Sequence, residues 1–408
     1  MQLGLIATAL FLLMLPVTGM VPVLRELTVG RYPELSGFAQ HLFMSANMLG
    51  ALLCVPLAGL LSDLWQRRRP IIAGAFALNA LSLLMLLQDW SYPVYLLWRF
   101  VEGCAHITAL SLLMTLAADH AHRRGSGAVM GLVGSAISLG VASGAPLGGW
   151  IGSGWIGVGG ADQVLQWGGV LMLLLAPLCA LLLRDLPSER KHGGLAALLR
   201  ALPANRPLLL PYAFGFVDRL TVGFIVSTLS LYLSQVIGLD AAGIGLTLAL
   251  FLIPFSLLTF PAGLLSRRWS PLTMMLAGSA AYGLTLTAVG LAPGAAIPWL
   301  MFAGGVTAAL MYAPSLVLVA ELSRPEHKAL AMSGFNFAGS LGFVLGPLTG
   351  GALVDLFDRY PPAFVIVGGL EVLCALAFLP LALRRYPRGW VEDVGRNKGR
   401  RPVSGSTR

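Results

Sequence analysis

The sequence predicts an all-α membrane protein with twelve transmembrane helices, arranged as two pseudosymmetric six-helix bundles. Of its 408 residues, 57% are hydrophobic and only 11% are charged, against roughly a quarter charged in a soluble domain. Twelve apolar runs follow one another along the chain, and short strings of residues recur about half a chain length apart. Most of the surface is therefore expected to face hydrocarbon, and the chain is expected to be a duplication.

Each apolar run is long enough to cross a membrane, because a helix needs about 20 predominantly apolar residues to span the hydrocarbon core. The first run is interpreted as a retained span and not as a signal peptide, since no basic residue precedes it and eleven more runs follow. The predicted helices cover residues 3–23, 38–62, 70–88, 92–117, 127–152, 164–184, 208–235, 242–266, 271–291, 296–320, 329–354 and 362–384.

Lysine and arginine are distributed unevenly over the connections between these helices. If both termini are cytoplasmic, 22 of the 27 basic residues lie on the cytoplasmic side, 3 on the outer side and 2 within spans. Cytoplasmic connections retain basic residues, so the bias predicts a multi-pass protein of the inner or plasma membrane with both termini cytoplasmic. The predicted domains are bundles at 1–184 and 208–384, a cytoplasmic linker at 185–207 and a basic cytoplasmic tail at 385–408.

Two recurring strings indicate the duplication. The string Ala-Gly-Leu-Leu-Ser at 58–62 ends the second predicted helix and returns at 262–266, 204 residues later. A Gly-Gly pair in the fifth helix returns in the eleventh, 202 residues later. Two six-helix halves related by an axis along the membrane normal are typical of transporters that bind their substrate near the midplane.

A charged motif follows the second predicted helix. Gly59 and Asp63 lead into Arg67 and Arg68. The glycine permits close helix packing, and an acid beside arginines at a helix end can form an ion pair that holds a cytoplasmic gate in one conformation. The motif resembles the signature of the major facilitator superfamily, with Gln66 in place of that family's second glycine. Alternatively, the arginines only anchor the topology.

Glycines recur at close spacing in the fifth and eleventh helices. Such spacing lets two helix backbones touch, and an internal proline bends a helix, so both helices are candidate pivots between the bundles. The fifth helix is similar to the signature of proton-coupled antiporters of the same superfamily, with its proline one position late. Ordinary tight packing is the alternative. The candidate hinge residues are Gly131, Gly140, Gly144, Pro146, Gly148, Gly149, Gly342, Gly346, Pro347, Gly350 and Gly351.

Arg99, Glu102 and His106 lie on one face of the fourth helix, because they are three and four residues apart. An arginine at a helix centre costs about 2.5 to 3.5 kcal/mol on insertion scales, so it is expected to meet a partner or a wet cavity. The group resembles the superfamily's buried-arginine signature. We expect Glu102 to be a proton-coupling acid, and the alternative is a static pair with Arg99.

Three more charged residues lie within predicted spans of the second half. Asp218 and Arg219 are near the middle of the seventh helix, where adjacent side chains diverge by about 100 degrees and meet different neighbours. Asp218 is a candidate for a proton or a substrate cation, and Arg219 for an anionic group or for Glu371 of the twelfth helix. An interhelical salt-bridge network is the alternative. Smaller polar candidates are His41, Asn47, Asn79, Thr108, Tyr312 and Asn336.

The sequence predicts no cofactor, no metal site and no enzymatic activity. The four cysteines are far apart in apolar runs, Asp119, His120 and His122 make a weak metal cluster, and no phosphate loop or nucleophile motif is present. The net charge of +9 is explained by topology, so nucleic-acid binding is not expected.

The superfamily resemblance implies alternating access. We expect the cargo to be a small lipophilic or amphipathic compound, exported in exchange for protons by a monomer in the lipid bilayer. The first helix has no acid, although many drug antiporters of the family carry one there. The alternatives are uptake of a small organic solute by a symporter or facilitator, and lipid flipping; a receptor or enzyme on this scaffold is not favoured.

Overall fold

The computed structural model describes residues 2–65, 67–121, 126–185, 207–266, 268–323 and 328–383, and these residues are helical with short connections and no strand. The N-terminal half contains α1 (Gln2–Gly19), α2 (Gly37–Trp65), α3 (Arg68–Met85), α4 (Tyr92–Ala121), α5 (Ser126–Gly152) and α6 (Ala161–Leu182). The C-terminal half contains α8 (Leu209–Phe224), η3 (Ile225–Leu229), α9 (Ser230–Gln235), α10 (Ala241–Leu265), α11 (Pro271–Leu291), α12 (Ile297–Leu322), α13 (Lys328–Phe357) and α14 (Pro361–Leu383).

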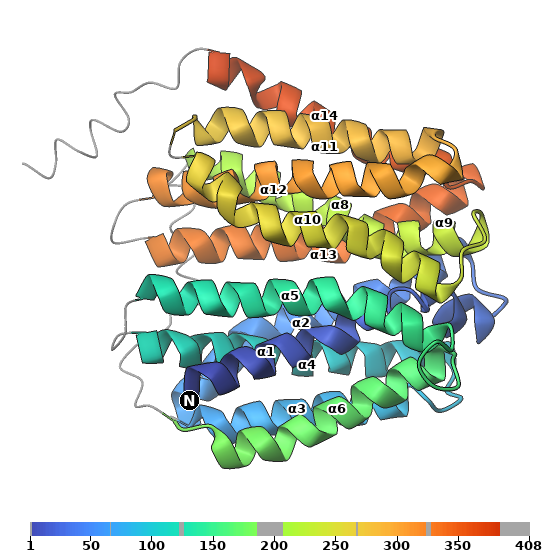
Figure 1. Cartoon of the computed structure of the whole chain (residues 1–408), viewed down its shortest axis with the longest axis vertical. Helices are drawn as coiled ribbons and strands as arrows, with labels where there is room; N and C mark the ends of the chain where they lie inside the picture. Colours follow the sequence, from blue (N-terminus) through green and yellow to red (C-terminus); the bar gives the residue numbers. More distant parts are fainter. Residues whose placement is uncertain are drawn as a thin grey trace, which may run out of the picture.

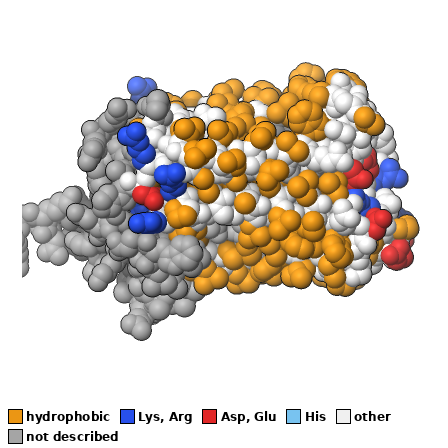
Figure 2. Space-filling view, turned by 90° about the horizontal axis from the view of Figure 1, so that it is seen from below, with side chains coloured by type: hydrophobic (Ala, Val, Ile, Leu, Met, Phe, Trp, Pro, Cys, Tyr) orange, Lys and Arg blue, Asp and Glu red, His pale blue; other side chains and the backbone are white. Residues whose placement is uncertain are grey.

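Eleven helical segments of the described chain are long and apolar enough to cross a membrane, with α8, η3 and α9 forming one of them. The remaining predicted span is α3, whose first turn contains Arg68 and Arg69. It nevertheless packs within the bundle, against α4 and α6. Figure 2 shows a broad apolar belt between two ends that carry the charged side chains, as a membrane-spanning protein requires.

The first helix is shorter than predicted. We expected it to extend to Val23, but α1 ends at Gly19, and a short π-helix, η1 (Glu26–Gly30), follows. Pro22 has no backbone N–H and its ring clashes with the preceding turn, so it prevents α1 from continuing. The residues on both sides of this break are apolar, so a count of apolar residues could not reveal it.

The two halves lie one above the other in Figure 1, and α1 begins at the end of the bundle where α14 finishes. Within the first half, α1 packs against α5, α2 against α4 and α3 against α6. In the second half, α8 packs against α13, α10 against α12 and α11 against α14. The halves meet where α5 contacts α10 and α2 contacts α13. The contact pattern is therefore the same in both halves, as expected of a duplication.

Glycines of α5 bring its backbone against α1. A Cβ atom on Gly140 would lie 2.5 Å from the Phe11 carbonyl oxygen, one on Gly144 would lie 2.7 Å from that of Leu15, and one on Gly148 would overlap Gly19. No side chain fits at these positions, so small residues set the distance between the two helices.

Equivalent glycines of α13 pack against α8 and η3. A Cβ atom on Gly342 or Gly346 would overlap the carbonyl oxygen of Phe216 or Leu220, and one on Gly350 would overlap the Thr228 hydroxyl. The predicted hinge glycines therefore form two matching rows, each of which fixes the fifth helix of a half on that half's first helix.

The second glycine of each Gly-Gly pair faces the opposite half. A Cβ atom on Gly149 would overlap the Ala241 carbonyl oxygen of α10, and one on Gly351 would lie 2.8 Å from Phe38 Cα of α2. The His41 ring donates through Nδ1 to the Gly37 carbonyl oxygen, and its Nε2 accepts from the Thr228 hydroxyl at 3.0 Å. These contacts close the seam between the halves.

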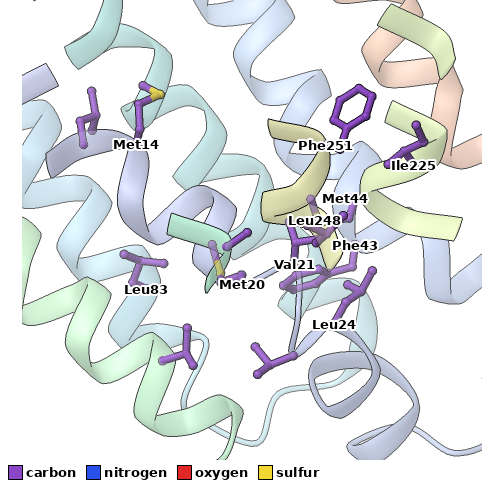
Figure 3. Close-up of a cluster of buried hydrophobic side chains, with 14 of the residues drawn as sticks. Met14, Met20, Val21, Leu24, Phe43, Met44, Leu83, Ile225, Leu248 and Phe251 are labelled. Atoms are coloured by element: carbon purple, nitrogen blue, oxygen red, sulfur yellow. The ribbon is translucent and has the colours of Figure 1, made fainter. Parts of the chain in front are cut away.

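Apolar side chains fill the same part of the seam. Val21, Phe43 and Met44 of the first half lie beside Ile225 and Phe251 of the second (Figure 3), and all belong to one buried cluster that extends through both halves. Burial of this cluster excludes water at that end of the seam.

The glycine contacts between the halves do not extend to the end that carries the start of α1. A Cβ atom on Gly131 or Gly134, in the first turns of α5, would have no heavy atom within 4 Å. The contacts of α5 with α10 that involve glycine lie in the opposite part of α5, at Gly149 and at Ala145, whose carbonyl oxygen would lie 2.6 Å from a Cβ atom on Gly245. These close backbone contacts thus lie toward the end that bears the connection from α5 to α6.

We predict different effects for alanine at neighbouring glycines of α5. Gly148→Ala forces α1 and α5 of one half apart, so it should destabilise the protein by about 1–3 kcal/mol. Gly149→Ala creates an overlap that rocking of the halves relieves, so it should change the separation of the halves more than the stability. Melting temperature and the distance between spin labels at exposed Leu132 and Leu257 measure the two effects.

Gly131→Ala is the matched control for this prediction. Its new methyl group meets no neighbour, so the melting temperature should stay constant or rise slightly, because alanine favours the helix by up to about 1 kcal/mol. Equal losses of stability for Gly148→Ala and Gly149→Ala, with an unchanged label distance in both, would contradict the assignment of the two glycines to different interfaces.

Candidate transport site

The arginines of the predicted gate motif lie at the start of α3 in different environments. Arg67 is exposed and precedes the helix in an extended conformation. Arg68 is buried and forms an ion pair with Asp119 of α4. The side chain of Asp63 lies outside the described part of the chain, so its ion pair with these arginines stays a prediction, as does close helix packing at Gly59.

Asp185, just after α6, caps α3. Its Oδ1 accepts hydrogen bonds from the backbone N–H groups of Arg68 and Arg69 at 3.0 and 2.8 Å. The first N–H groups of a helix have no partner within it, and an anion there complements the helix dipole. The contact joins the start of α3 to the end of α6, and it could not be predicted because Asp185 is more than 100 residues from Arg68 and Arg69 in the chain.

Glu102 is the centre of a buried polar network in the N-terminal half. Its Oε2 accepts hydrogen bonds from Arg99 and from Asn47 of α2, and its Oε1 accepts from Asn79 of α3 at 3.1 Å. Arg99 and Glu102 are fully buried, and the guanidinium carbon lies 4.8 Å from the centre of the Phe43 ring. The network therefore links α2, α3 and α4 around one neutralised pair.

The donors around Glu102 determine what this group can do chemically. Arg99 supplies the counterion, and both carboxylate oxygens of Glu102 already accept hydrogen bonds, so a new ligand must displace a donor to reach either one. His106 is also buried and lies within electrostatic reach of Glu102 and Arg99. The three residues predicted on one face of α4 are thus neighbours in the structure, and Arg99 and Glu102 form the ion pair that the static interpretation expects.

Arg219 has a more open environment than its neighbours on α8. Its side chain is 23% exposed, whereas Asp218 and Leu220 are buried. A guanidinium in the middle of an apolar span is costly against lipid, so this exposure indicates a water-accessible face inside the protein. One Nη atom donates to the Tyr312 hydroxyl at 3.0 Å, and Nε lies 3.9 Å from Asp218 Oδ2. Arg219 is therefore paired only loosely.

Aromatic rings surround the Arg219 guanidinium. Its carbon lies 5.0 Å from the centre of the Tyr312 ring of α12 and 5.3 Å from that of Phe343 of α13. The ring of Phe255, on α10, is 5.8 Å from that of Tyr312. Because α10 and α13 also form the seam with the other half, a cationic group and several ring faces lie beside that seam. Such a set can hold an aromatic compound with an anionic group.

Glu371 of α14 is fully buried, and its Oε1 accepts a hydrogen bond from the Ser279 hydroxyl of α11 at 2.5 Å. It lies within electrostatic reach of Asp218 and of Tyr282. From the sequence, Arg219 was a candidate partner for Glu371, and no other partner could be named. In the structure the described hydrogen bond of Arg219 is to the Tyr312 hydroxyl, and the described hydrogen bond of the Glu371 side chain is from Ser279.

Sequence reasoning missed the side chains that complete these groups. Ser279 and Tyr282 lie between small and apolar residues of α11, a pattern that usually indicates packing. Asn47, Asn79 and Tyr312 were minor candidates, and the structure places each against a charged group.

In the described part of the chain no three His, Cys, Asp or Glu side chains come together as a metal site. Of the weak metal cluster named above, Asp119 pairs with Arg68, and the side chains of His120 and His122 lie outside the described residues.

The sequence matches the model of one protein family and parts of two described proteins. The model of a family described as the Major Facilitator Superfamily matches residues 6–217 and 211–405. Human solute carrier family 67 member A1 is 28% identical over 198 residues, which are 47% of this chain and 44% of that protein. The uncharacterized MFS-type transporter YqjV of Bacillus subtilis (strain 168) is 26% identical over 164 residues, 39% of this chain and 40% of that protein. The chain thus matches less than half the length of either relative.

Solved transporters are similar over nearly the whole chain. The nucleoside transporter NupG has a TM-score of 0.76 and 16% identity, and the match covers 93% of this chain and 99% of that one. A bacterial homologue of the human lysosomal transporter Spinster, inward-facing and occupied, has a TM-score of 0.78 and 15% identity, with 93% and 96% covered. The D-xylose-proton symporter has a TM-score of 0.72 and 17% identity, with 92% and 95% covered. At these identities the likeness shows the fold.

We predict that Glu102→Gln is strongly destabilising. The change leaves the Arg99 charge buried without its counterion, which typically costs about 3–5 kcal/mol. The double variant Arg99→Met, Glu102→Gln removes both charges and should recover most of the loss in melting temperature. If the single variant melts like the unaltered protein and abolishes proton-driven transport, the static interpretation of the pair is wrong and Glu102 is a coupling acid.

Proposed function

Because this chain belongs to the Major Facilitator Superfamily and is a multi-pass secondary transporter, we propose that it exports a small lipophilic or amphipathic compound in exchange for protons. The proposal rests on the partly exposed Arg219 guanidinium, which lies among the rings of Tyr312 and Phe343. A compound that combines an apolar ring with a negative charge matches both parts of this site. We assign no enzymatic activity to the chain.

The distribution of charge supports an orientation with both termini cytoplasmic, in the inner or plasma membrane. Arg31, on the connection after η1, forms an ion pair with Asp162 and donates a hydrogen bond to the Leu86 carbonyl oxygen. One of the few basic residues assigned to the outer side is therefore neutralised. In this orientation the glycine contacts between the halves lie toward the outer side. We infer that the halves open toward the cytoplasm, the side from which an exporter loads its substrate.

The glycine rows support a rocking motion between the halves. Three glycines hold α5 on α1, and three hold α13 on α8, so each half can move as a unit while the contacts at Gly149 and Gly351 open. We assign Pro146 and Pro347 to the same pivots, since each lies within its helix one turn or less from these glycines. The ion pair of Arg68 with Asp119 keeps the cytoplasmic ends of α3 and α4 together within one half.

The carboxyl groups of the C-terminal half are better suited to proton coupling than Glu102. Glu102 is neutralised by Arg99 and receives three donors, whereas Asp218 and Glu371 lie within electrostatic reach of each other and have one loosely placed arginine nearby. Two acids that share one arginine are not both paired, so they are the better candidates for exchanging a proton.

Uptake of a small organic anion with protons is the second candidate. The same Arg219 could hold its carboxylate, and a proton symporter and a nucleoside transporter have this fold. Lipid flipping would require an acyl-sized apolar path that continues to the bilayer. The direction of proton-driven flux distinguishes export by antiport from uptake by symport.

We predict that vesicles containing the purified protein accumulate an aromatic carboxylate when their interior is acidic. Protons that leave drive the compound inward through an antiporter, whichever way the protein is inserted. Candidate compounds are first selected by thermal stabilisation of the protein. Accumulation only with an acidic exterior would identify a symporter and overturn the proposed direction.

Arg219→Gln should lower kcat/KM for such a compound roughly 10- to 100-fold, because a hydrogen bond to a charged group contributes about 1.5–3 kcal/mol. Arg25→Gln, which removes an exposed arginine outside the spans, is the matched control and should transport normally. Equal kinetics for Arg219→Gln and the control would exclude the Arg219 face as the substrate site.

A further inference from the structure

Asp355, near the end of α13, caps the start of α2 in the opposite half. Its Oδ2 atom accepts a hydrogen bond at 3.0 Å from the backbone N–H of Phe38, the second residue of α2. The first N–H groups of a helix have no partner within it, and a carboxylate there complements the helix dipole. We propose that Asp355 is a gate-positioning residue, and that this cross-half cap holds the halves together where α2 begins and breaks when they part.

The sequence at the start of α2 leaves room for the cross-half cap. A Cβ atom on Gly37, the first residue of α2, would overlap Asp355 Oδ1. Any larger residue at this position would therefore push the carboxylate away from the Phe38 N–H. The Ser36 hydroxyl accepts from the Ala39 N–H at 3.2 Å. The start of α2 is thus capped by one residue of its own half and by one residue of the other half.

Other side-chain hydrogen bonds between the halves lie at the same end of the seam. Among the described residues they join His41 to Thr228, Ser45 to the Val344 carbonyl oxygen, Ser230 to the Val21 carbonyl oxygen, and Gln235 to Gln40. None of these groups carries a charge in this arrangement. Hydrogen bonds that involve a charged group are roughly twice as strong as neutral ones. Asp355 is therefore expected to make the strongest single contact of this set.

The other side of the seam, where α5 meets α10, is closed differently. Backbones touch there at Gly149 and Gly245, and the Ser256 hydroxyl donates a long hydrogen bond of 3.4 Å to the Ser138 carbonyl oxygen. Within the described chain, no printed hydrogen bond or ion pair of a charged side chain crosses the seam on this side. A change at Asp355 therefore alters the attraction between the halves without altering the packing of α5 on α10.

The cross-half cap can form and break at low cost. Asp355 and Phe38 are both exposed, so water replaces each partner when the halves part. The net loss is the difference between a hydrogen bond within the protein and one to water. For a helix cap this difference corresponds to a factor of roughly 2 to 30 in an equilibrium between two conformations. That factor shifts the balance of conformations and still allows the contact to break in every cycle.

The cross-half cap favours the conformation that is closed where α2 begins. Without it the halves part there more often, and a site between them faces that side for a larger fraction of the time. This inference rests on the rocking motion of the proposed function, but it does not depend on the direction of transport or on the coupling ion. An exporter and a symporter would both have to break the same contact once in each cycle.

The reaction rate of a buried thiol measures how often the halves part. Val21 is buried in the seam cluster of Figure 3, and Val21→Cys places a thiol there in a full-length chain whose four native cysteines are replaced. A water-soluble maleimide, added to the purified protein in detergent, reaches this thiol only when that end of the seam is open. The alkylation rate is then proportional to the open population, even where that population is small.

Asp355→Ala removes the acceptor and should raise the alkylation rate roughly 2- to 30-fold. Asparagine caps helices about as well as aspartate, so the rate for Asp355→Asn should lie closer to that of the chain with Asp355 than to that of Asp355→Ala. Gly37→Ala displaces the carboxylate, so it should also raise the rate, and it should add nothing to Asp355→Ala. Asp358→Asn, which changes an exposed acid just after α13, is the matched control and should leave the rate unchanged.

A thiol inside one half is the control for general loosening of the fold. Ala375 is buried in a cluster formed only by helices of the C-terminal half, and a thiol introduced by Ala375→Cys should react equally slowly with or without Asp355→Ala. The proposal is overturned if Asp355→Ala raises the rate at Val21→Cys by less than about 2-fold. It is also overturned if both thiols gain equally, because Asp355 then only stabilises the fold. Vesicles without proton-driven flux, with these alkylation rates intact, would overturn the proposed transport and leave the cross-half cap standing.

Discussion

Close approach of helix backbones at glycine is the interaction on which this structure depends. Helices in hydrocarbon gain little by burying apolar side chains against each other, since lipid is equally apolar, so their association relies on packing and on interhelical hydrogen bonds. Gly140, Gly144 and Gly148 place α5 directly on α1, and the equivalent glycines of α13 place it on α8. Both halves are built around such a pair, and the remaining helices pack around it.

The same helices also make the contact between the halves, through a different face. Gly148 touches α1 of its own half, whereas Gly149, about 100 degrees further round the helix, touches α10 of the other half. The first interface has three glycines along its length, and the second is concentrated near one end. Separation of the halves at that end therefore disturbs few contacts within either half, which is the mechanical condition for rocking of rigid bundles.

The positions of the helices could be predicted because they depend on local composition. The predicted helix at 271–291 coincides with α11, where Pro271 begins the helix. The prediction was wrong where a local feature opposed composition, as at Pro22 after α1. Partners of buried groups could not be predicted, because they depend on helix rotation and on neighbours distant in sequence. Asn79 meets Glu102 only because α3 lies beside α4, and Ser279 meets Glu371 only because α11 lies beside α14.

The buried charges reveal an asymmetry that the duplication of helices conceals. In the first half, an arginine and an acid one turn apart on α4 neutralise each other, and asparagines from two more helices complete the network. In the second half, the acids lie on α8 and α14, and the arginine turns toward aromatic rings at the seam. The buried acid of the first half has a counterion of its own, whereas the two acids of the second half have one loosely placed arginine near them. The shared helical framework therefore stays symmetric while the buried charges of the two halves differ in how completely they are paired.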